Sequence, residues 1–178
     1  MPNFMVDLET LSAETNAAII SIGVVKFSGK GTSEEFYRTV DWDTSRQAGG
    51  DVSTSTLRWW MGQSDEARKA VVKLGSPSLF QTLQELTTWL SKNGGNKSST
   101  VMWGNGSDFD NPILANAFKS VNLEVPWNFW NNRCYRTMKE VLGKNIPMVK
   151  SGVQHNALAD AKQQAEHLVK ILNALGGK

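Results

Sequence analysis

Residues 17–27 read AAIISIGVVKF, an almost continuous apolar run. Isoleucine and valine dominate it, and such β-branched residues are typical of a strand that is buried on both faces. A shorter strand is expected before the run, over residues 4–9, and a third strand after it, over residues 34–40. Because only the short turn SGKG at residues 28–31 separates the last two, an antiparallel meander is predicted.

The pattern becomes helical in the second third of the chain. Leucines at positions 79, 83, 86 and 90 form the apolar stripe of a helix predicted over residues 76–92. One further strand is predicted at residues 99–104, and residues 144–154 are expected to form a loop. The other predicted helices cover residues 53–63, 64–74, 111–121, 133–143 and 156–175. Strands followed by mixed helices and strands indicate an α/β fold, and we expect residues 1–178 to form one domain.

Composition narrows the classes of function. The formal net charge of +2 and the pI of about 8.7 are compatible with a nucleic-acid partner without requiring one. Cys134 is the only cysteine, which excludes an intramolecular disulfide and a cysteine zinc site. No signal peptide is recognisable, so a reducing, cytoplasmic location is expected. No apolar run approaches the roughly 20 residues that span a bilayer, so no membrane partner is expected.

Two acids interrupt the first strand, in VDLET at residues 6–10. Asp7 and Glu9 point to the same face because side chains alternate along a strand, and their Cα atoms lie about 7 Å apart. An amphipathic strand with one solvated face would explain this pattern. Two carboxylates held together in a partly buried site would instead repel each other, and a hard divalent cation would remove that cost.

Two more acidic segments follow. In WGNGSDFDNPIL at 103–114, Asp108 and Asp110 lie where a strand gives way to a helix, a position that also favours plain helix capping. In the segment from 155 to 175, Asp160 lies off the apolar stripe of the last helix, and His155 stands just before that helix. A solvated helix face and a loop histidine are the alternatives.

Taken together, these segments resemble the DEDD superfamily of 3′–5′ exonucleases. VDLET resembles the first motif, Asn105 to Asp110 resembles N-x-x-x-F-D, and His155 to Asp160 resembles H-x-x-x-x-D. The register with Asn105 selects Asp110 over Asp108 as the expected ligand. A histidine five positions before the last aspartate is similar to the DEDDh subclass.

Two further stretches resemble a narrower group. TLRWWMGQSDEAR at 56–68 and FWNNRCYRT at 129–137 are similar to phage and prophage DexA-like exonucleases and to small bacterial exoribonucleases. The resemblance implies an RNase H-like fold, a mixed five-stranded sheet flanked by helices. It also implies an enzyme that removes nucleoside 5′-monophosphates from 3′ ends.

The resemblance further implies the roles of the site residues. Four carboxylates would hold two divalent cations, Mg²⁺ or Mn²⁺, on either side of the scissile phosphate: Asp7, Glu9, Asp110 and Asp160. His155 would be the general base, because an ordinary histidine pKa of about 6.5 suits that role at neutral pH.

Several residues are expected on the substrate side of the site. By resemblance, Thr10 and Leu11 would contact the terminal nucleotide, and Asn105 and Phe109 of the second motif would lie beside it. Tryptophans can stack on bases, with core packing as the alternative, and arginines can contact phosphate, with surface ion pairing as the alternative. The candidates of these two kinds are Trp59, Trp60, Trp130, Arg133 and Arg136.

The leading hypothesis is therefore an exonuclease on single-stranded DNA or 3′ overhangs. An exoribonuclease is a close variant, because no feature reads the 2′-hydroxyl decisively. A catalytically silent nucleic-acid-binding module and a protein-interaction domain, which could form a homodimer through its aromatic surface, are the other classes. All four carboxylates and the histidine are present, which argues against a catalytically silent module.

Overall fold

The computed structural model describes residues 1–148 and 155–176. Five strands form one mixed sheet in the order β3-β2-β1-β4-β5, so β1 is its central strand. β1 and β2 are antiparallel, as are β2 and β3, whereas β4 lies parallel to β1 and β5 lies parallel to β4. The strands are β1 (Asn3–Thr10), β2 (Ile19–Ser28), β3 (Gly31–Thr39), β4 (Val101–Gly104) and β5 (Asn132–Cys134). The predicted meander and the mixed five-stranded sheet are confirmed.

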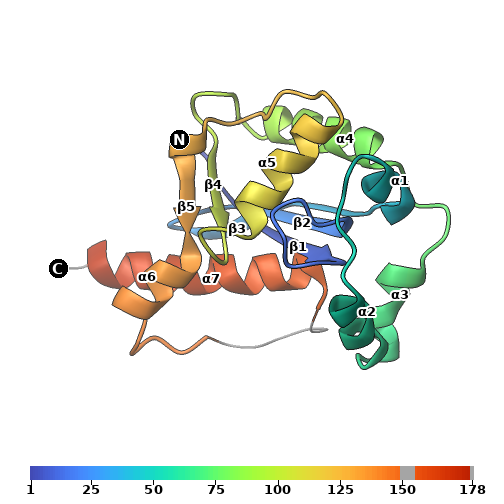
Figure 1. Cartoon of the computed structure of the whole chain (residues 1–178). Coiled ribbons are helices and arrows are strands. Elements are labelled where there is room, and N and C mark those ends of the chain that lie inside the picture. Colours follow the sequence, from blue (N-terminus) through green and yellow to red (C-terminus); the bar gives the residue numbers. More distant parts are fainter. Residues whose placement is uncertain (149–154, 177–178) are drawn as a thin grey trace.

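Helices cover both faces of the sheet (Figure 1). They are α1 (Trp42–Gln47), α2 (Thr54–Met61), α3 (Asp65–Val72), α4 (Leu79–Lys92), α5 (Asp110–Ser120), α6 (Tyr135–Leu142) and α7 (Ala157–Gly176), with a 3₁₀ turn at Phe129–Asn131. The leucine stripe of α4 and the apolar side of α5 pack on one face, against Phe4, Val6 and Leu8 of β1. On the other face Met5 packs against α6 and α7. Alternation along β1 therefore directs Asp7 and Glu9 to the α7 face.

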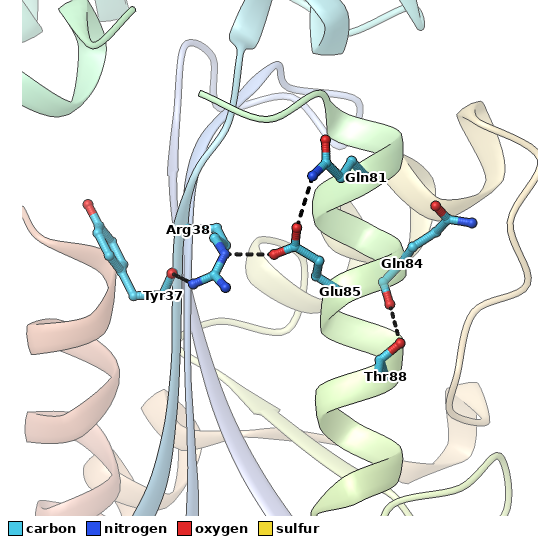
Figure 2. Close-up of polar contacts among 6 residues, drawn as sticks. All are labelled: Tyr37, Arg38, Gln81, Gln84, Glu85 and Thr88. Atoms are coloured by element: carbon cyan, nitrogen blue, oxygen red, sulfur yellow. Dashed lines mark hydrogen bonds and ion pairs between the residues drawn. The ribbon is translucent and has the colours of Figure 1, made fainter. Parts of the chain in front are cut away.

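Polar contacts fix the edge strand β3 against α4 (Figure 2). Arg38 donates from Nε to Glu85 of α4 over 2.7 Å and from a terminal nitrogen to the carbonyl of Tyr37 over 2.8 Å. Gln81, one turn before Glu85, donates to the second carboxylate oxygen over 3.2 Å. These groups are largely exposed, so their contribution is mainly to orient β3.

Two short elements and several boundaries differ from the sequence-based expectation. The segment at 42–47 is a helix whose cap is Asp41, and residues 132–134 form strand β5 rather than the beginning of a helix. Both elements are too short to show a hydrophobic period. Cys134 instead caps α6, accepting a hydrogen bond from the backbone of Thr137. The predicted loop at 144–154 lies partly outside the described residues.

One glycine lets α7 approach the sheet closely. Gly23 of β2 pairs directly with Asp7 of β1. A Cβ at Gly23 would lie only 2.2–2.4 Å from backbone atoms of Ala157 and Leu158, at the beginning of α7. The missing side chain therefore allows the first turn of α7 to lie over Asp7. No helix in the described part of the chain is long and apolar enough to cross a bilayer.

Candidate active site

Three carboxylates meet at the carboxyl end of the central strand. Asp7 and Glu9 come from β1 and Asp160 from the first turn of α7, and one oxygen from each lies within 4.8 Å of the others. Glu9 is almost completely buried, and the other two are partly buried. The acids of the first and third motifs, more than 150 positions apart, are thus brought together as predicted.

Asp110 reaches the same place from the beginning of α5. One carboxylate oxygen accepts the backbone N–H of Leu8 over 3.1 Å, and the other accepts the N–H of Asn105 over 2.8 Å. The N-cap position of α5 belongs to Phe109, so Asp110 does not cap the helix. These two bonds fix its carboxylate against β1, where its charge raises the pKa of both Asp7 and Glu9.

The four acids are held at a high electrostatic cost. Burial, followed by repulsion from Asp110, Glu9 and Asp160, raises the pKa of Asp7 well above its usual range. Burial, together with repulsion from Asp160 and Asp110, raises the pKa of Glu9 to about 8.

The pKa values of the two acids on helices, Asp110 and Asp160, are raised as well. Burial raises the pKa of Asp110 to about 6, against the backbone hydrogen bonds that lower it. Burial also raises the pKa of Asp160, although His155 and the backbone N–H groups of His155 and Asn156 oppose this. The group of acids is therefore destabilising to the folded chain unless positive charge offsets it.

The donor set fits a hard divalent cation. Every candidate ligand atom is a carboxylate oxygen, which Mg²⁺ and Mn²⁺ prefer, and neither thiolate nor imidazole takes part in the group of three. A bound cation would also remove the repulsion that raises the four pKa values.

A cavity of about 300 Å³ opens over the carboxylates. His155 lines it together with Asp7, Glu9 and Asp160, as the third motif predicts. The other residues of the wall are Leu8, Thr10, Ser12, Ala13, Thr56, Trp59, Trp60 and Phe109. This combination provides acids, a proton acceptor and aromatic surface in one space.

Helix α2 supplies one wall of the cavity. Ser53 caps the helix by accepting the N–H of Thr56. Thr56, Trp59 and Trp60 share one helix face because they are three and four positions apart. Trp60 is buried and donates its indole N–H to the carbonyl of Thr10 over 2.9 Å, whereas Trp59 is 44% exposed. Packing thus accounts for Trp60, and Trp59 presents the accessible ring.

The structure corrects four of the expected positions. Leu11 is completely buried among Ala18, Ile20 and Trp60, so it offers no surface to a nucleotide. Trp130 is 61% exposed and packs edge-on against Phe129, away from the cavity wall.

Arg133 lies on β5 and donates to the carbonyls of Trp130 and Asn132, not toward the carboxylates. Asn105 contributes a backbone N–H to Asp110, but its side chain does not line the cavity. Sequence position alone could not show these orientations.

Two other residues of the second motif region are also placed. The carboxylate of Asp108 accepts the hydroxyl of Ser107 over 2.6 Å and lies outside the group of acids. Arg136 of α6 lies close enough for its charge to lower the pKa of Asp110. Of the two candidate arginines, it is therefore the one whose charge acts on the acids.

Sequence reasoning missed two supporting residues. Gln164 donates its amide to Asp7 over 2.7 Å, and its position four residues after Asp160 on the same helix face was the available signal. Asn156 accepts the N–H of Ala159 and so caps α7, which its place just before the helix also indicates.

Comparisons with known proteins identify the family and the fold of the chain. A family model described as "3'-5' exoribonuclease Rv2179c-like domain" matches residues 2–172. An exodeoxyribonuclease of Enterobacteria phage T4 is 27% identical over 168 residues, covering 80% of this chain and 72% of the phage protein.

Solved structures show the same fold. The nuclease domain of 3'hExo, a DEDDh family member bound to rAMP, superposes with a TM-score of 0.63 at 19% identity, over 97% of this chain and 92% of that domain. Exonuclease X in complex with 5' overhanging duplex DNA gives a TM-score of 0.60 at 15% identity, over 98% and 93% of the two chains. Both likenesses support the RNase H-like fold. Because the family model covers nearly its whole length, this chain belongs to the Rv2179c-like family of 3′–5′ exoribonuclease domains.

Proposed function

We propose that residues 1–178 act as one metal-dependent domain that removes nucleoside 5′-monophosphates from the 3′ ends of single-stranded DNA or from 3′ overhangs. The observation that supports this most is the meeting of Asp7, Glu9 and Asp160 in one cavity that His155 also lines. A solvated strand face and a solvated helix face, the plainer alternatives, do not account for acids buried against one another.

Asp7, Glu9, Asp110 and Asp160 would hold two divalent cations, Mg²⁺ or Mn²⁺. The cations would supply charge stabilisation to the attacking and leaving oxygens of the displacement. The chain itself orients the carboxylates, through Leu8 and Asn105 for Asp110 and through Gln164 for Asp7.

His155 would accept the proton of the attacking water. The water oxygen forms a bond to phosphorus while the bond from phosphorus to the 3′ oxygen breaks. That oxygen then takes a proton from solvent water, and His155 later returns its proton to the solvent. This role is supported by the position of His155 on the wall of the cavity that the acids also line. Phe109 offers ring surface on which the terminal base can stack.

RNA is the second candidate substrate. The description of the matching family names an exoribonuclease, whereas the T4 relative is named an exodeoxyribonuclease. Nuclease assays on DNA and RNA oligonucleotides of identical sequence, with one labelled end, would give the ratio of the DNA rate to the RNA rate. A ratio above one supports the proposed preference for DNA. A ratio below one would show that RNA is the preferred substrate.

The activity is tested by Asp7→Ala in the same assay with Mg²⁺, Mn²⁺ or EDTA. We expect mononucleotide release from the 3′ end in the wild type with either metal, and none in EDTA or in the variant. Asp108→Asn is the matched control, because it removes a carboxylate that lies outside the acidic group. Unchanged release by Asp7→Ala, or no release by the wild type in Mn²⁺, would refute the proposal.

A further inference from the structure

His155 is held by its backbone in an unusual conformation. Its φ angle is 61°, in the left-handed region that histidine rarely adopts. In this conformation the backbone N–H groups of His155 and Asn156 stabilise the Asp160 carboxylate. The main chain of the histidine is therefore tied to one of the candidate metal ligands, although this does not determine where the imidazole points.

The imidazole is in contact with two tryptophans. Its ring lies 4.8 Å from the Trp59 ring at an interplanar angle of 84°, and 6.5 Å from the Trp60 ring at 80°. Trp59 and Trp60 are themselves packed edge-on, with centroids 4.9 Å apart. Among the described residues, no hydrogen bond restrains the imidazole, so these ring contacts are its visible side-chain support.

The tryptophans are in turn attached to the strand that carries the acids. Trp60 is 3% exposed and donates its indole N–H to the carbonyl of Thr10, the residue after Glu9. A continuous series of contacts thus runs from the end of β1 through Trp60 and Trp59 to His155. Ser53 caps the beginning of α2, the helix that carries both tryptophans.

We propose that Trp59 is the positioning residue that holds the His155 imidazole toward the carboxylates. The inference rests on the proposed function, in which His155 accepts the proton of the attacking water. A general base must lie within hydrogen-bond reach of that water, and a ring free to change rotamer spends only part of its time there. The edge-on contact with Trp59 favours the ring position seen here, so we expect loss of the indole to lower the fraction of competent molecules.

A double-mutant cycle on the hydrolysis rate separates this role from base stacking. We expect Trp59→Ala to lower kcat about 10-fold or more, within the range known for a misplaced catalytic group. Trp59→Phe keeps a ring at this position and is expected to restore most of the rate. If Trp59 acts through His155, Trp59→Ala has no further effect on kcat in a His155→Ala background. An equal loss in both backgrounds would assign Trp59 to the substrate instead and overturn the proposal.

A second measurement does not depend on activity. The chain has two histidines, and His167 is buried against Tyr135, so the NMR signals of the two imidazoles can be distinguished. We expect Trp59→Ala to move the His155 ring signals, through loss of the indole ring current, and to leave the His167 signals in place.

The matched control is Phe129→Ala, which removes an exposed aromatic ring from the other adjacent pair. It should leave both histidine signals unchanged. Unchanged His155 signals in Trp59→Ala would refute the contact even if the chain proved to have no nuclease activity, whereas an inactive wild type with the expected NMR shift would refute only the proposed function.

Discussion

The two histidines of the chain, His155 just before α7 and His167 in the middle of that helix, have similar ring contacts but different surroundings. The His155 ring meets Trp59 edge-on at 4.8 Å, and the His167 ring meets Tyr135 edge-on at 5.9 Å. His155 lines a cavity with three acids, and no described group hydrogen-bonds its imidazole. Both nitrogens of His167 are bonded, Nδ1 to the Tyr135 hydroxyl and Nε2 to the carbonyl of Ile146, each over 2.7 Å.

The two imidazoles differ in whether their ring nitrogens are occupied by hydrogen bonds. A carbonyl can only accept, so Nε2 of His167 carries its hydrogen, and in the neutral ring Nδ1 accepts the Tyr135 hydroxyl. Such a satisfied, buried ring has no capacity left for a substrate. Within residues 1–148 and 155–176, no hydrogen bond occupies either ring nitrogen of His155. Because this imidazole also lies beside carboxylates of raised pKa, we expect the segment just before α7, and not the middle of the helix, to be reactive.

The largest effect is expected from His155→Ala. The rate of nucleotide release should fall by about 10²–10⁴, the usual contribution of a general base. Mn²⁺ affinity should remain, because the acidic group consists of carboxylates alone. Single-turnover hydrolysis and calorimetric Mn²⁺ titration check the two parts. Loss of Mn²⁺ binding in this variant would make His155 a ligand and remove the distinction between the two histidines.

His167→Leu should show the opposite profile. It leaves the Ile146 carbonyl and the Tyr135 hydroxyl without their partner in a buried place, which costs about 2–4 kcal/mol of the free energy of unfolding. Urea denaturation measures this loss. The hydrolysis rate of the folded fraction should stay near that of the wild type. A rate loss comparable to that of His155→Ala would show that His167 also serves the reaction.

Gln164→Leu tests the support of the site between the two histidines. The variant removes the amide that donates to Asp7 over 2.7 Å, and loss of such a partner typically lowers metal affinity by about 10–100-fold. Mn²⁺ titration is the measurement. Gln81→Leu is the matched control because its amide bonds only the exposed Glu85 (Figure 2). Equal affinities for the two variants would mean that Gln164 does not orient Asp7.

The smallest effect is expected from Glu9→Gln in metal-free protein. The folded pKa of Glu9 is raised to about 8, so the folded state binds the extra proton between the ordinary glutamate pKa and pH 8. Wild-type stability therefore falls as the pH rises through this window, whereas Gln has no charge to lose.

Thermal unfolding at two pH values checks this sign. The variant should melt roughly 2–6 °C above the wild type at pH 9 and at the same temperature near pH 4, at about 2–4 °C per kcal/mol for a chain of this size. Saturating Mg²⁺ should remove or reverse the difference. A variant that is less stable than the wild type at pH 9 without metal would show that the Glu9 charge is already compensated by the protein.

The sequence predicted the helices and strands whose apolar residues recur with a regular spacing. It also predicted the acids that stand in recognisable motifs. The β-branched run of β2 and the leucine stripe of α4 repeat over enough residues to be recognised. Asp110 and Asp160 were selected by their resemblance to the family's second and third motifs, and the order of the strands brings Asp110 to β1.

The remainder depends on tertiary contacts that no local pattern encodes. Trp59 and Trp130 both follow or precede another aromatic residue, and both pairs pack edge-on at nearly equal separations. Only the fold decides that α2 lines the cavity and that Trp130 does not. Leu11 was misplaced for the same reason, because a motif gives the position of a residue along the chain and not the direction of its side chain.

The arrangement of ligands has a consequence for how the protein is made. Asp7 and Glu9 enter the sheet early in the chain, Asp110 stands far beyond them, and Asp160 arrives on α7, the last helix of the described residues. If these acids hold the metal as proposed, a ribosome that has not yet released α7 carries a chain without a complete metal site. The chain would then be unable to cut nucleic acid during most of its own translation, including its own message, and would gain that ability when α7 docks over Gly23.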